Sequence, residues 1–127
     1  MKTNQLDTDE FRQIAAAGLA VLLALELTML LAMLSRTPPH PPLEVALFAL
    51  GPFLGASISL ALAGLMLGSA RTVTSRAVSL AAVLFALISF GPQKWLDPAF
   101  PKIWPAVIVG QLAAMSILWA CWRASKH

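Results

Sequence analysis

Long apolar segments, separated by short polar or proline-rich ones, dominate the pattern along the chain. A transmembrane helix needs roughly 20 mostly apolar residues, and four segments meet or approach this length. No segment alternates strictly between apolar and polar residues, as a half-buried β-strand does. The pattern predicts an all-α integral membrane protein, a four-transmembrane-helix bundle with short loops, with spans at about 14–34, 43–67, 73–90 and 103–122.

Clear helix-ending signals separate these spans. The segment 35–42 contains four prolines, which remove backbone donors and disfavour helix at the preceding residue. A Gly-Ser-Ala-Arg-Thr sequence at 68–72 follows the second span, and Gly91-Pro92 ends the third. We expect residues 91–102 to form an interfacial turn on the outer side, with a short turn of helix near Pro98. The whole chain, 1–127, is then a single transmembrane domain.

Composition agrees with this class. The chain is 58% hydrophobic and only 12% charged, whereas a soluble domain is typically about 25% charged. These values exclude an intrinsically disordered chain and a nucleic-acid-binding domain, so we expect no nucleic-acid partner. The single Cys, Cys121, excludes a disulfide scaffold.

Basic residues predict the orientation, because Lys and Arg accumulate in cytoplasmic loops. An even number of spans puts both termini on one side, together with Lys2, Arg12, Arg71, Arg76, Arg123 and Lys126. The opposite side holds only Arg36, Lys94 and Lys102. We therefore expect a multi-pass protein of the inner or plasma membrane with both termini in the cytoplasm.

Small residues at four-residue spacing mark candidate packing faces. Lipid is as apolar as Leu, so membrane helices associate through close approach and polar contacts. The second span carries one such stripe and the fourth span a shorter one, comprising Gly51, Gly55, Ser59 and Ala63, then Gly110 and Ala114. These stripes predict helix packing, within the chain, in a homo-oligomer, or against a membrane partner subunit.

Glu26 is the one acid well inside a predicted span. Such residues are costly in a bilayer and usually face a bundle interior or a cavity. Counted at about 1.5 Å per residue, Glu26, Gln111 and Ser57 lie at nearly the same depth. These three residues are our candidate intramembrane polar site. Three interpretations of Glu26 remain open: a Glu–Gln hydrogen bond that aligns two helices, a proton-titrating or cation-binding carboxylate, and an acid that pairs with a partner.

The outer turn is a candidate docking surface, because it combines rings, prolines and both charge signs in Lys94, Trp95, Asp97 and Trp104. A rigid interfacial turn anchored by its Trp rings explains the same residues. The stretch 94–100 is similar to a turn of DoxX-like membrane proteins, which have it after the first span rather than the third. A glutamate in the first of four helices is similar to small multidrug resistance transporters, but their later motifs are absent. No family is assigned.

No spacing of His, Cys, Asp or Glu matches a metal site, and no Ser, His and Asp set falls at one depth. We therefore expect no enzyme activity and no cofactor. The first hypothesis is a non-catalytic inner-membrane accessory or assembly subunit, or a self-associating scaffold. The alternative is a proton-coupled small transporter or channel that acts as an oligomer through Glu26. A third hypothesis is lipid or quinone binding at the outer Trp-rich turn.

Overall fold

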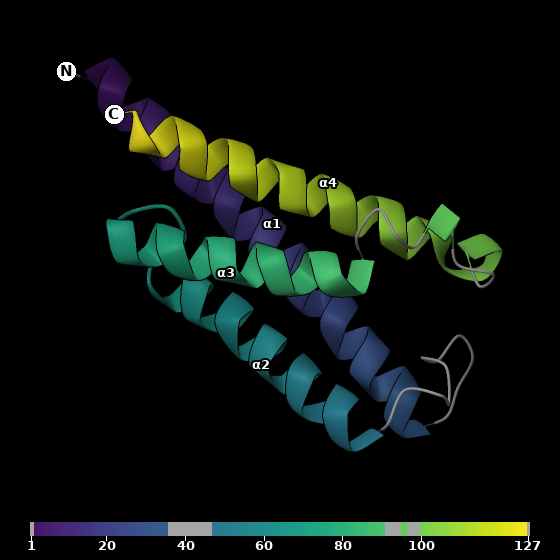
Figure 1. The fold of residues 1–127 in the computed structure, drawn as a ribbon. Coiled ribbons are helices and arrows are strands. Elements are labelled where there is room, and N and C mark those ends of the chain that lie inside the picture. Colours follow the sequence, from purple (N-terminus) through teal and green to yellow (C-terminus); the bar gives the residue numbers. More distant parts are fainter. Residues whose placement is uncertain (1, 36–46, 91–94, 97–99, 127) are drawn as a thin grey trace.

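Four helices make up the protein in a computed structural model that describes residues 2–35, 47–90, 95–96 and 100–126. They are α1 (Lys2–Ser35), α2 (Leu47–Met66), α3 (Val73–Phe90) and α4 (Phe100–Ser125) (Figure 1). No strand occurs in these ranges. The prediction of an all-α fold with four helices is therefore confirmed for the described part of the chain.

The helices run alternately up and down, so that both termini and the α2–α3 turn lie at one end (Figure 1). Helix α1 is central, because it contacts α2, α3 and α4, and its most extensive contact is with α4. Helix α3 packs against α2 and α4, while α2 and α4 do not touch in the described residues. Consecutive helices are antiparallel neighbours, as expected for a bundle joined by short connections.

Two of the helices are long and apolar enough to cross a membrane, Asp7–Ser35 in α1 and Trp104–Ser125 in α4. At 1.5 Å per residue, these segments of 29 and 22 residues are about 44 and 33 Å long, against a hydrocarbon core of about 30 Å. The apolar parts of α2 and α3, Gly51–Met66 and Val73–Ser89, are shorter. That α2 and α3 also cross the membrane stays a prediction.

The helix limits differ from the predicted spans where polar residues extend an apolar segment. Helix α1 begins at Lys2 rather than near residue 14, and α4 runs from Phe100 to Ser125 rather than from 103 to 122. Pro105 lies inside α4, in its second turn, where its missing N–H removes one helical hydrogen bond. In the predicted outer turn, only Trp95, Leu96 and the α4 residues 100–102 belong to the described part, and Pro98 lies outside it.

The α2–α3 turn satisfies its own backbone groups at both helix ends. Gly68 has a φ of 88°, and the amides of Ser69 and Gly68 donate to the carbonyls of Gly64 (2.7 Å) and Leu65 (3.2 Å). This is a Schellman cap, which requires a left-handed residue that glycine supplies without strain. Helix α3 then starts with a reciprocal cap, in which Ser75 N donates to Thr72 Oγ1 (3.1 Å) and Thr72 N donates to Ser75 Oγ (2.8 Å).

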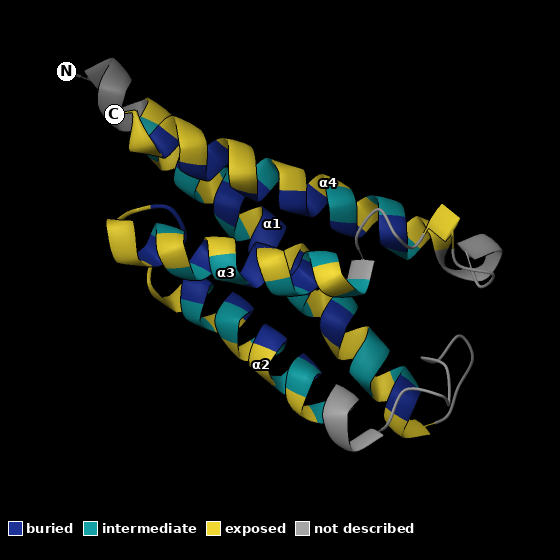
Figure 2. Ribbon diagram, viewed as in Figure 1, coloured by how far each residue is buried: buried dark blue, intermediate teal, exposed yellow. Residues whose placement is uncertain are grey.

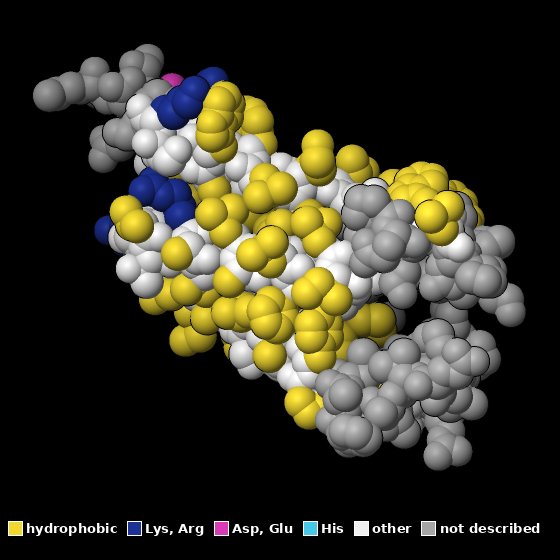
Figure 3. All heavy atoms as spheres, viewed as in Figure 1, with side chains coloured by type: hydrophobic (Ala, Val, Ile, Leu, Met, Phe, Trp, Pro, Cys, Tyr) yellow, Lys and Arg dark blue, Asp and Glu magenta, His cyan; other side chains and the backbone are white. Residues whose placement is uncertain are grey.

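The interior contains polar groups while much of the outer surface is apolar. Large residues such as Leu19, Leu54 and Ile117 are fully buried, but so are the polar side chains Glu26 and Ser57. Exposed residues line the outward side of each helix (Figure 2), and many of them are large and hydrophobic, including Leu31, Leu34, Met66, Leu84, Ile88, Leu112 and Met115. Figure 3 shows one face of the molecule, on which hydrophobic side chains cover the middle and Lys and Arg side chains gather near the termini.

Candidate functional site

Glu26 lies on the buried face of α1. Ala15, Leu19, Leu22 and Glu26 follow one another at intervals of three or four residues, so they share one side of the helix. All four are buried, and Glu26 is only 1% exposed. The position of the acid follows from the apolar periodicity around it, which turns this side of α1 towards the other helices.

Ser57 reaches Glu26 from the buried face of α2, where it lies between Leu54 and Ala61. Its hydroxyl donates a hydrogen bond to Glu26 Oε1. The second carboxyl oxygen, Glu26 Oε2, is buried and has no hydrogen-bond partner among the described residues. Two of the three residues of the predicted polar site are thus in contact, and the acid keeps one open position.

Gln111 has a different described partner. Its amide oxygen accepts a hydrogen bond from Trp95 Nε1 at 3.3 Å, which joins α4 to the turn that precedes it. Its position along α4 places Gln111 at the depth of Glu26, but the rotation of α4 decides which way the side chain points. A count of residues along a helix contains no information on this rotation relative to a neighbouring helix.

No described cation neutralises Glu26. The salt bridge found within the described ranges joins Arg12 to Asp9 at the terminal end of α1 (3.1 Å). In the same ranges, no three His, Cys, Asp or Glu side chains come together as a metal site requires. An unpaired buried charge is expensive, so the open oxygen of Glu26 is suited to hold a proton or to meet a group brought by another molecule.

Among the described residues, the predicted stripe on α2 makes no close approach at its two glycines. A Cβ atom added to Gly51 or Gly55 would meet nothing within 4 Å. Ser59 is exposed and Ala63 is half-buried, and the Ser59 hydroxyl bonds to the carbonyl oxygen of Gly55 (2.7 Å). On α4, both Gly110 and Ala114 are buried in the bundle.

Close approach between α1 and α4 is made by Gly18, which lies outside the predicted stripes of small residues. A Cβ added to Gly18 would lie 2.6 Å from Ile117 Cγ1 and 3.0 Å from the carbonyl oxygen of Ala113. A similar addition at Gly64 would lie 3.0 Å from Leu19 Cδ1 and 3.1 Å from Ser79 Oγ. Glycine inside a helix costs about 1 kcal/mol relative to alanine, so the lone glycine of the first span was itself a signal of a packing requirement.

The predicted docking turn is described only in part. Lys94 and Asp97 lie outside the described residues. Trp95 and Trp104 are both about half exposed, at 50% and 49%. The geometry that the structure gives for this turn is the Trp95–Gln111 bond, which fixes the indole against α4.

No protein-family model matches the chain, and neither a curated protein nor a solved structure matches it.

Proposed function

We propose that the protein is a small multi-pass inner-membrane protein with cytoplasmic termini, which acts as an accessory subunit or self-associating scaffold by binding another transmembrane helix. The observation that carries the proposal is the open glycine face of α2. Gly51 and Gly55 leave space where a side chain would normally lie, and no helix of this chain fills that space in the described residues.

The distribution of side chains supports placement in a bilayer. Large hydrophobic residues such as Leu34, Met66 and Met115 are more than 60% exposed, whereas the carboxyl group of Glu26 is buried. Monomeric soluble proteins rarely expose large contiguous apolar surfaces. The basic residues whose side chains are described lie near the termini and the α2–α3 turn (Figure 3), which fits a cytoplasmic location for that end.

The chemistry of helix association in lipid supports the choice of α2. Small residues let two backbones approach closely, and van der Waals contact then supplies the attraction that the hydrophobic effect does not. At Gly18 and Gly64 this contact is already made inside the chain. At Gly51 and Gly55 the described residues make no such contact, so a helix of a second copy or of another subunit has room to approach.

The test is the mass of the particle extracted in mild detergent, measured for the wild type, Gly55→Leu and a control. Ala77→Leu on the exposed side of α3 adds a comparable side chain away from α2. We expect the wild type to be larger than a monomer, Gly55→Leu to lose the partner, and Ala77→Leu to keep it. A wild-type particle that is strictly monomeric and free of partners would contradict the proposal.

A second function is supported by a separate observation, the open oxygen of Glu26. A buried carboxyl group with one free position fits a proton-coupled transporter or channel for a small cation or amphiphile. In this alternative, Ser57 orients the carboxyl group and an oligomer encloses the pathway. Flux into liposomes should be abolished by Glu26→Gln and unchanged by Glu10→Gln, a matched change at an exposed acid. Wild-type flux equal to that of empty vesicles removes this alternative.

A further inference from the structure

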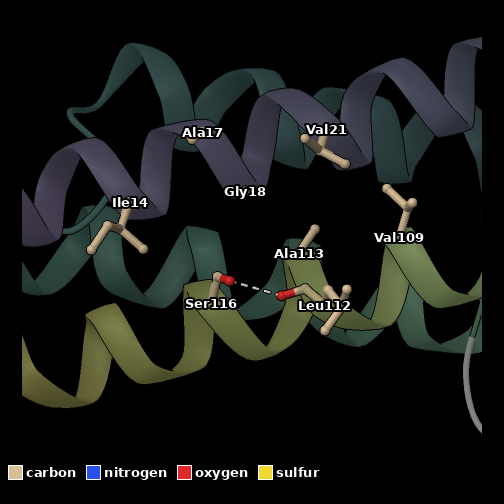
Figure 4. Close-up of a pocket in the computed structure, with 8 residues that line it drawn as sticks. All are labelled: Ile14, Ala17, Gly18, Val21, Val109, Leu112, Ala113 and Ser116. Carbon is tan, nitrogen blue, oxygen red and sulfur yellow. Dashed lines mark hydrogen bonds between the residues drawn. The ribbon is translucent and has the colours of Figure 1, made fainter.

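A groove of about 330 Å³ lies between α1 and α4, on the side that faces away from α2 and α3 (Figure 4). Its walls are apolar and include Ile14, Gly18, Val21, Val109, Leu112 and Ser116. The Ser116 hydroxyl is already bonded to the carbonyl oxygen of Leu112, at 2.8 Å. The groove therefore offers a bound molecule an apolar surface, because its one hydroxyl group already donates a hydrogen bond within α4.

The groove leads to an aromatic and cationic cluster at the terminal end of the same helix pair. Phe11 and Trp119, each three residues beyond a groove residue, pack edge to face with ring centroids 5.4 Å apart. The Arg123 guanidinium lies 5.7 and 5.8 Å from the two ring centroids. On α4 the positions 109, 112, 116, 119 and 123 follow at helical spacing, so Arg123 lies on the groove side.

The donors of Arg123 are available. Its described interactions are the two ring contacts, and it has no ion pair or side-chain hydrogen bond within the ranges that the structure describes. Asp9, in the first turns of α1, forms its ion pair with Arg12 at 3.1 Å. A planar guanidinium with free N–H groups matches the oxygens of a phosphate and binds them in a bidentate manner.

We propose that this groove binds one acyl chain of an anionic phospholipid, whose phosphate is held by Arg123. The inference rests on the membrane placement proposed above. The groove and the cation are correctly spaced for one leaflet, because Arg123 lies two helical turns beyond Ser116, or about 10 Å. The groove extends a further 10 Å or so towards Val109. Its far end therefore lies about 20 Å from Arg123 along α4, and half of the hydrocarbon core measures about 15 Å.

The size of the groove favours a hydrocarbon chain over a protein helix. A volume of about 330 Å³ holds on the order of ten methylene groups, if each takes a share similar to the 30 Å³ of a water molecule. A helix with its side chains is about 10–12 Å across and would cover the groove rather than enter it. Trp119, which is 46% exposed, supplies the amphipathic ring that is typical of the boundary between chain and headgroup.

The experiment is native mass spectrometry of the full chain, released from detergent that contains equal amounts of phosphatidylglycerol and phosphatidylcholine with identical acyl chains. Phosphatidylcholine carries its own cation, which competes with the arginine for the phosphate. We expect about fivefold more phosphatidylglycerol adduct, the factor that one basic residue near an anionic headgroup supplies. Arg123→Gln should make the two adducts equal, and Arg123→Lys should retain part of the preference.

Two further variants separate the site from general electrostatics and from misfolding. Arg71→Gln removes the same charge from the α2–α3 turn at the same end and should keep the preference. Ala17→Leu fills the groove from an exposed position and should reduce the adducts of both lipids.

The inference would be overturned by equal amounts of the two lipid adducts on the wild type, or by a loss of preference in Arg71→Gln as large as in Arg123→Gln. It would also be overturned if Ala17→Leu left the adducts unchanged, or if Ala17→Leu abolished a dimer. These outcomes leave the membrane fractionation of the protein and the particle mass of Gly55→Leu untouched, so the proposed function is judged separately.

Discussion

Replacing Gly18 with alanine should destabilise the bundle, although alanine is the better helix former. At an open site in a helix, glycine to alanine is worth up to about 1 kcal/mol of added stability. At Gly18 the new Cβ would lie 2.6 Å from Ile117 Cγ1 and 3.0 Å from the carbonyl oxygen of Ala113. The second atom belongs to the backbone of α4, so a side-chain rotation does not relieve the contact.

The magnitude follows from what must move. Overpacking of a well-filled interior typically costs 1–3 kcal/mol, and the propensity gain offsets at most about 1 kcal/mol of this. We therefore expect a net loss of up to about 2 kcal/mol for Gly18→Ala. Gly55→Ala is the matched control, because it lies in α2 with nothing within 4 Å of the added carbon, and it should be neutral or stabilising.

The assay is the unfolding midpoint in mixed micelles with increasing SDS, followed by circular dichroism, for the wild type and both variants. The double variant Gly18→Ala with Ile117→Ala adds a test of mechanism, because the shortest contact is removed while the backbone contact stays. Its loss should be smaller than the sum of the two single losses, as expected for residues in contact. Additive losses, or equal midpoints for Gly18→Ala and Gly55→Ala, would show that α1 and α4 do not meet at Gly18.

Other substitutions test the polar contact and the turn with the same unfolding assay. Ser57→Ala leaves the carboxyl group of Glu26 without its described donor and should cost about 1–3 kcal/mol. The Ser59 hydroxyl bonds within its own helix in the described residues, so Ser59→Ala should change the free energy of unfolding by no more than about 0.5 kcal/mol. Equal effects of Ser57→Ala and Ser59→Ala would exclude a stabilising role for the Glu26 contact. Gly68→Ala, at a φ of 88°, should lose about 1–2 kcal/mol, and an unchanged midpoint would argue against the Schellman cap.

The sequence pattern was sufficient to predict the four helices, because strong local signals mark where most of them end or begin. The prolines of 35–42 and the Gly-Ser-Ala-Arg-Thr turn at 68–72 separate apolar segments of helical length, and the described helices end or begin close to these points. The sequence was less informative at helix ends such as Lys2, where polar residues continue a helix that the apolar pattern does not include.

The candidate site shows what periodicity leaves undetermined. Depth along a helix follows from a fixed rise per residue, and it placed Ser57 level with Glu26, where the hydroxyl indeed donates to the carboxyl group. The same rise per residue predicts Gln111 in that layer, whereas the hydrogen-bond partner described for Gln111 is Trp95. Helix rotation depends on packing along the whole interface, including the contact at Gly18, and no residue spacing within one helix defines it.

The extensive contact between α1 and α4 has a consequence for how the chain folds during synthesis. Proteins emerge from the ribosome N-terminus first, so α1 is complete while the 26 residues of α4 are still to come. Pairing of the first and last helices is a contact of long sequence separation, which forms late because a long loop must close. Until then the groove side of α1 around Gly18 has no α4 to cover it, and a chain truncated before Phe100 would keep that side of its first helix open to other membrane helices.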